Sequence, residues 1–80
     1  LTNGSVLDTA LKSAAANAQK QYKTNAEAFI QDLFMKGLQR QPTAKELHLL
    51  KSIYQTNPSA LAYHDILWIF INLPEFQSIL

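Results

Sequence analysis

The chain has 80 residues, of which 48% are hydrophobic and 16% charged, and its net charge is +1. This composition indicates one folded domain, because disordered chains combine low hydrophobicity with high net charge. The absence of cysteine excludes disulfides, thiolate metal sites, CxxCH haem attachment and cysteine catalysis. A chain of this length buries little more than about 60% of its unfolded surface, so a deep catalytic cleft would compete with its core.

Two classes of partner are also disfavoured. Lysine and arginine are scattered from Lys12 to Arg40, and only Lys45 and Lys51 follow, so no basic cluster is available to bind phosphates. We therefore expect no nucleic-acid partner. The longest apolar run has six residues, 66–71, whereas a membrane span needs about 20, so we expect no transmembrane segment. The abrupt start at Leu1 leads us to expect a piece of a longer protein.

Helix starts are marked by a hydroxyl residue followed three positions later by an acid, the pattern of a capping box. The three pairs are Ser5 with Asp8, Thr24 with Glu27, and Thr43 with Glu46. A fourth start is Asn57-Pro58, where proline would occupy the first helical position. We predict helices near 5–21, 25–40, 43–56 and 58–72, followed by a last helical turn from Pro74 to Ile79.

The apolar residues recur at helical spacing, which predicts the buried faces. In the second helix the stripe comprises Ala26, Phe29, Ile30, Leu33, Phe34, Gly37 and Leu38, and in the third Leu47, Leu50, Ile53 and Tyr54. In the fourth helix it comprises Tyr63, Ile66, Ile69, Phe70 and Leu73, with Leu67 and Ile71 beside them. Without a side chain, Gly37 would allow a close approach. Phe76 and Ile79 are expected to cover the core.

The first helix differs, since its apolar positions are mostly small. They are Leu7, Leu11, Ala14, Ala18 and Tyr22. We leave open whether residues 1–22 are a peripheral helix or the end of a linker, with residues 25–80 forming the core. The predicted fold is all-α, a compact four-helix domain with a short C-terminal helical turn, spanning residues 1–80 as a single domain.

A second stripe runs along the fourth helix, away from its main apolar face. It contains Leu61, Asp65, Trp68 and Asn72. Functionally, it could be a ligand or partner groove. Structurally, Asp65 would pair with a cation such as Arg40, Trp68 would fill a gap against the first or second helix, and Asn72 would bind backbone groups near the Pro74 turn. We favour the structural interpretation, because tryptophan in a small domain is usually buried in the core.

Motifs for chemistry are lacking. His48 and His64 lie on different predicted helices, and neither belongs to an HxxxH or HxxE pattern, so we predict no metal site. His64 and Asp65 should not form a dyad, because neighbouring helical side chains diverge by about 100°. The sequence has no GxGxxG, P-loop or GxSxG motif, and we predict no catalytic residue, cofactor or enzymatic activity.

Two spaced motifs carry a resemblance to a known family. The first is Phe29-Ile30-x-x-Leu33-Phe34-x-x-x-Leu38-x-Arg40-x-Pro42-Thr43-x-x-Glu46-Leu47, and the second is Asp65-Ile66-Leu67-Trp68-x-x-x-Asn72-x-Pro74-Glu75-Phe76. Over residues 29–76 the chain resembles the C-terminal part of the planctomycete-type, cytochrome-c-associated (PSD) domain family of unknown function. Leu73 departs from this pattern, because the family commonly has a small hydroxyl residue there.

The resemblance implies a C-terminal helical module of a large exported bacterial protein, periplasmic or at the cell surface, with no assigned activity. The matching positions would be structural or would contribute to an interface. They are Arg40, Pro42, Glu46, Asp65, Trp68, Asn72, Glu75 and Phe76.

We expect a non-catalytic accessory or interaction domain whose partner is another domain of the same protein or a second copy of the chain. The reason is a surplus of apolar surface, since 16 of the 29 residues from 52 to 80 are apolar. The alternative is a small-molecule or carbohydrate-binding module around Trp68. It predicts a concavity with Trp68 partly open and two titratable groups converging.

Overall fold

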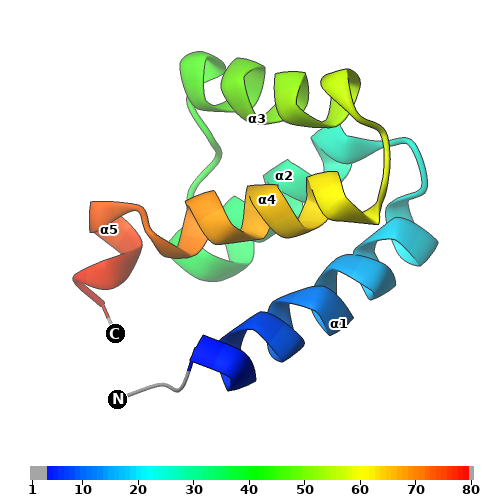
Figure 1. Ribbon diagram of the computed structural model, residues 1–80. Coiled ribbons are helices and arrows are strands. Elements are labelled where there is room, and N and C mark those ends of the chain that lie inside the picture. Colours follow the sequence, from blue (N-terminus) through cyan, green and yellow to red (C-terminus); the bar gives the residue numbers. More distant parts are fainter. Residues whose placement is uncertain (1–3, 80) are drawn as a thin grey trace.

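The protein is an all-α domain in the computed structural model, which describes the backbone of residues 4–79 and the side chains of residues 6–79. The helices are α1 (Gly4–Tyr22), α2 (Ala26–Leu38), α3 (Ala44–Thr56), α4 (Ala60–Ile71) and the short α5 (Pro74–Gln77) (Figure 1). Within the described residues there are four substantial helices and no strand, which confirms the predicted fold class.

Helix α4 lies in the middle of the domain. Helices α1 and α3 pack against it on opposite sides and run antiparallel to it, while α2 lies behind (Figure 1). After α4 the chain turns at Leu73 into α5, which contacts both α2 and α4. The central position of α4 explains why it is the most apolar element, since three helices cover it.

One hydrophobic core joins the four long helices. Its buried members are Leu11, Ala15, Ala18, Ala26, Phe29, Ile30, Phe34, Leu50, Tyr54, Ala62, Tyr63, Ile66, Leu67 and Phe70. Helix α1 contributes Leu11, Ala15 and Ala18 to this core, so it is not peripheral. The expected stripe is wrong at Ala14, which is exposed, because Ala15 takes its place. Small side chains at this face let α1 lie close to α4.

Two tyrosine hydroxyls form hydrogen bonds with the turn between α1 and α2. Tyr54 and Tyr63 both donate to the backbone carbonyl of Lys23, at 3.0 and 2.8 Å. Lys23 itself has a left-handed backbone, with φ of 55°. The Tyr63 ring also packs edge-on against Phe29, with centroids 4.9 Å apart. Residues from α3 and α4 thus hold the end of α1 in place.

The predicted helix caps are correct in one case. The Thr43–Glu46 capping box is present: the Glu46 N–H donates to Thr43 Oγ1 at 3.1 Å, and the Thr43 N–H donates to Glu46 Oε1 at 2.8 Å. The Thr24 cap is wrong, because the left-handed turn at Lys23 moves the start of α2 one residue on. There Asn25 Oδ1 accepts from the Ala28 N–H at 3.1 Å.

The start of α4 also differs from the prediction. The Asn57-Pro58 cap is wrong, because Ser59 is still extended and the helix begins at Ala60. The Ser59 side chain makes no capping hydrogen bond. The side chain of Ser5 lies outside the described residues, so the capping box predicted for α1 does too.

Gly37 permits a close approach, as predicted. A Cβ atom at this position would lie 2.5 Å from Cζ of Phe70 and 3.5 Å from the Phe76 ring. The Phe76 ring in turn packs on Phe70 with centroids 5.0 Å apart, which agrees with its expected place over the core. The same expectation is wrong for Ile79, which is 62% exposed because α5 has already ended before it.

Candidate functional site

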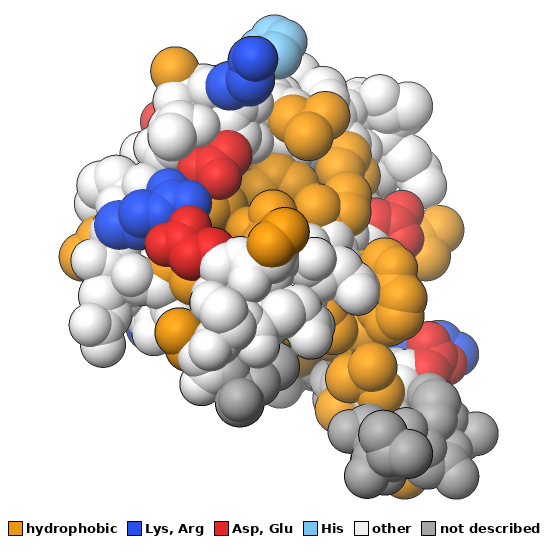
Figure 2. Space-filling view, turned by 90° about the vertical axis from the view of Figure 1, so that its left-hand side faces the viewer, with side chains coloured by type: hydrophobic (Ala, Val, Ile, Leu, Met, Phe, Trp, Pro, Cys, Tyr) orange, Lys and Arg blue, Asp and Glu red, His pale blue; other side chains and the backbone are white. Residues whose placement is uncertain are grey.

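Four of the residues singled out by the sequence gather where α2, α3 and α5 meet. Arg40 donates through Nη1 and Nη2 to the two carboxylate oxygens of Glu46, at 2.9 and 3.1 Å. It also donates through Nη2 to Glu75 Oε1 at 2.8 Å. The adjacent Phe76 anchors α5 in the core. Figure 2 looks onto this side of the molecule and shows a basic side chain between two acidic ones, beside exposed apolar side chains.

This arginine cluster (Arg40, Glu46 and Glu75) is electrostatically satisfied. Arg40 holds the pKa of Glu46 at about 2, mainly through their hydrogen bonds, although partial burial works against this. It also lowers the pKa of Glu75. The guanidinium carbon lies 5.2 Å from the Phe34 ring centroid. Every charge in the cluster therefore has a partner, which indicates a structural link.

Local backbone features explain how Arg40 reaches both acids. Gln39 ends α2 with a left-handed φ of 58°, which turns the chain away from the helix axis. The capping box at Thr43 then fixes Glu46 in the first turn of α3. Pairing of Asp65 with Arg40 is wrong, because the two glutamates take up its donors.

The second stripe of α4 lies on the surface. Trp68 is 49% exposed and Leu61 58%, and Asp65 and Asn72 are also exposed. The prediction that Trp68 fills a gap against the first or second helix is therefore wrong, since about half of its side chain stays in solvent. The physical reason is that neighbouring helices cover α4 on three sides only. Side chains on the fourth side of the helix, such as Trp68, therefore remain exposed to solvent. Asn72 does bind the backbone, donating from Nδ2 to the Trp68 carbonyl at 2.8 Å.

A groove runs between α1 and α4 next to this stripe. We call it the α1/α4 groove, and it is lined by Leu7, Asp8, Leu11, His64, Asp65 and Trp68. Its volume is about 320 Å³, at the lower end of the range of about 300–1,000 Å³ usual for ligand sites. A second groove of about 290 Å³ lies on the other side of His64 and is lined by Lys12, Ala15, Ala60, Leu61 and His64.

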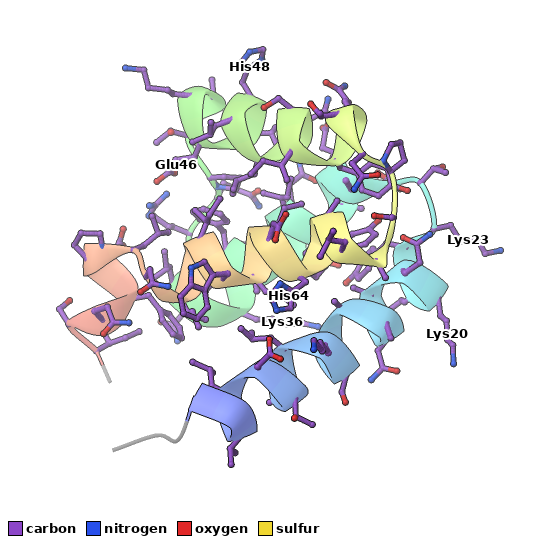
Figure 3. The ribbon with its side chains drawn as sticks, in the orientation of Figure 1. Lys20, Lys23, Lys36, Glu46, His48 and His64 are labelled. Atoms are coloured by element: carbon purple, nitrogen blue, oxygen red, sulfur yellow. The ribbon has the colours of Figure 1, made fainter. Side chains whose placement is uncertain are left out.

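His64 separates the two grooves and lies between two carboxylates. Its Nε2 is 3.4 Å from Asp8 Oδ1 on α1, and its Nδ1 is 3.6 Å from Asp65 Oδ1. Both ring nitrogens are buried and neither makes a hydrogen bond. In Figure 3 His64 reaches from α4 toward α1. The His64 and Asp65 side chains come closer than the predicted divergence of neighbouring helical positions implies, at 3.6 Å, but no hydrogen bond joins them into a dyad.

Asp8 is the residue of this site that sequence reasoning missed. Lys12, one turn later on α1, donates to it at 2.9 Å and lowers its pKa, with a smaller contribution from His64. No sequence signal connects Asp8 with His64, because the two residues lie near opposite ends of the chain. Only the antiparallel packing of α1 on α4 brings them together.

Residues 4–79 contain a second histidine, on α3. His48 is exposed on α3 and points away from the domain (Figure 3). In this part of the chain no three histidine or acidic side chains are arranged to hold a metal ion. No helix there has the length and apolarity needed to cross a membrane.

The chain was compared with known protein families, with curated proteins and with solved structures, and none of them matches it.

Proposed function

We propose that this chain is a non-catalytic interaction module of a larger exported bacterial protein, and that α1 and α4 supply its contact surface. The observation that supports this proposal is the exposure of Trp68, which lines the α1/α4 groove, and of Leu61, which lines the second groove. Large apolar side chains that stay exposed along one side of a helix favour protein contacts. Arg40, Glu46 and Glu75, in contrast, are already paired with one another.

The proposal includes the resemblance of residues 29–76 to the PSD family, from which its wider context is taken. Positions in that pattern fall into two groups here. Arg40, Glu46 and Glu75 tie helices together, whereas Asp65 and Trp68 lie on the surface. We assign the second group to the contact with another domain of the same protein or with a second copy of the chain.

A photo-crosslinking experiment tests this proposal. A photoreactive phenylalanine analogue replaces Leu61 in the protein in which the domain occurs. The control places it at Leu49, which is similarly exposed, at 56%, but lies on α3. We expect crosslinks from position 61 to one defined segment and none from position 49. Equal labelling from both positions, or no crosslink at all, would contradict the proposal.

Light scattering over a concentration series then separates the two kinds of partner. A mass that rises to that of a dimer assigns the crosslinked segment to a second copy of the chain. A constant monomer mass, together with crosslinks from position 61, assigns it to another domain.

A second candidate, a small-molecule or carbohydrate-binding module, is favoured by the half-open Trp68 and by the approach of Asp8 and Asp65 to His64. Sugars stack on exposed indole rings while acids accept from their hydroxyls. A titration of Trp68 emission with neutral sugars tests it. Saturable changes would favour this candidate over a protein partner.

A further inference from the structure

The α1/α4 groove carries an unbalanced negative charge. Asp8 is paired with Lys12, at 2.9 Å. Asp65 is more than half exposed, and among the described residues it forms no ion pair with lysine or arginine. Its Oδ1 lies 3.6 Å from Nδ1 of His64. The whole chain has a net charge of +1, so this groove differs in sign from the rest of the molecule.

An exposed indole lies next to the Asp65 carboxylate. Trp68 follows Asp65 by three residues on α4, which places both on the same side of the helix. An aromatic face attracts a cation, and a carboxylate accepts its hydrogen bonds. Leu7 and Leu11 on α1 form the apolar wall opposite. The groove therefore suits a group with a positive head and an apolar stem.

Arginine fits this combination better than lysine. Its planar guanidinium can stack on an indole and donate two parallel hydrogen bonds to one carboxylate, whereas an ammonium is a strongly hydrated point charge. We propose that the α1/α4 groove binds an arginine side chain of a protein partner, with the guanidinium between Trp68 and Asp65 and the methylenes against Leu7 and Leu11. This inference rests on the proposed function as an interaction module.

We extend the proposal to the second groove, which would hold a further residue of the same partner segment. Its lining is mainly apolar, with Leu61 at its rim. Leu61 and Trp68 are seven residues apart on α4, a distance of about 10 Å along a helix. An extended peptide covers this distance in about three residues. The partner segment therefore has an apolar residue three positions away from its arginine.

A peptide titration tests this inference, because Trp68 is the sole tryptophan of the chain and its emission reports on the groove. The probe is a capped hexapeptide with leucine and arginine three positions apart. In the matched control peptide citrulline replaces arginine, which keeps the shape and removes the charge. We expect saturable binding of the arginine peptide and about tenfold weaker binding of the citrulline peptide.

Protein variants locate the contact. Asp65→Asn should weaken binding of the arginine peptide about tenfold and leave thermal unfolding unchanged. Asp32→Asn is the matched control. Asp32 is an exposed acid outside this groove, and its carboxylate accepts a hydrogen bond from the Tyr22 hydroxyl. Trp68→Leu, studied by calorimetry because it lacks the fluorophore, should also weaken binding.

The outcomes separate this inference from the function on which it rests. Equal affinity for the arginine and citrulline peptides, or an unaltered affinity in Asp65→Asn, would overturn the arginine site. If crosslinks from position 61 persist in that case, the interaction module stands and only its ligand chemistry is wrong. If neither the peptides bind nor the crosslinks form, both conclusions fail.

Discussion

The two sides of α4 use similar residues in different ways. Its inner side consists of Ala62, Tyr63, Ile66, Leu67 and Phe70, all buried. Its outer side carries Leu61, Asp65, Trp68 and Asn72, all exposed. Both sides contain aliphatic and aromatic groups, so residue type alone does not separate them. The difference teaches that, in this helix, neighbouring elements decide which apolar side chains stabilise the fold and which remain available for contacts.

The largest effect should come from the inner side. Phe70 packs edge-on against Phe34, with centroids 5.1 Å apart, and also against Phe76. Phe70→Ala should lower the free energy of unfolding by about 3–5 kcal/mol, because it removes a buried ring and leaves a cavity. Urea unfolding followed by circular dichroism measures this loss.

The outer side provides the matched control. Trp68→Ala also removes an aromatic ring from α4, but at a surface position, where substitutions usually change stability by no more than about 0.5 kcal/mol. A loss as large as that of Phe70→Ala would mean that Trp68 supports the fold, and the comparison of the two sides would break down.

An intermediate effect is expected in acid, from the arginine cluster. The folded protein holds the pKa of Glu46 at about 2, below its ordinary value of 4.5. Ionised Glu46 therefore stabilises the folded state. Its contribution is fully present above the ordinary pKa of 4.5 and is lost as the pH falls toward 2. We expect a loss of about 1–2 kcal/mol, reduced from the full linkage value by solvent screening at this surface pair.

Urea unfolding at neutral and acid pH measures this contribution, with Glu46→Gln as the control that should abolish most of the difference. The comparison of the two sides becomes sharper if Phe70→Ala lowers the free energy of unfolding by the same amount at both pH values, since the inner side of α4 carries no charge. If the loss of free energy of unfolding caused by Phe70→Ala varied with pH, packing on the inner side could not be treated as independent of the arginine cluster.

An effect smaller than that of the arginine cluster should come from a single hydroxyl on the inner side. Burial raises the pKa of Tyr63 to about 12, so the phenol stays neutral and donates to the Lys23 carbonyl. Tyr63→Phe should cost about 1 kcal/mol, the usual net value of one hydrogen bond. A double-mutant cycle with Tyr54→Phe tests whether the two tyrosines compensate for each other at their shared acceptor.

Helical periodicity predicted the four long helices and most of their buried faces, because the spacing of apolar residues depends only on local geometry. Phe34 and Ile66 were placed correctly in this way. Periodicity gives the direction of a side chain but does not say whether a neighbour covers it. For this reason the sequence alone places Trp68 in the core, although its side chain is half exposed.

The remaining errors have two other physical sources. Helix starts depend on turns of a few residues, and the left-handed conformation of Lys23 shifted one cap to Asn25. Partners of charged groups depend on tertiary packing. Arg40 therefore pairs with two glutamates and not with Asp65. Asp8 lies close to His64 although no pattern in the sequence connects the two residues.

The shared carbonyl of Lys23 also bears on the order in which the chain folds. Its two donors are 31 and 40 residues further along the chain, so this junction closes only after two large loops have been formed. Loop closure costs entropy that local helix formation does not. We therefore expect low φ-values for Tyr54 and Tyr63, and changes at this junction should alter the unfolding rate more than the folding rate.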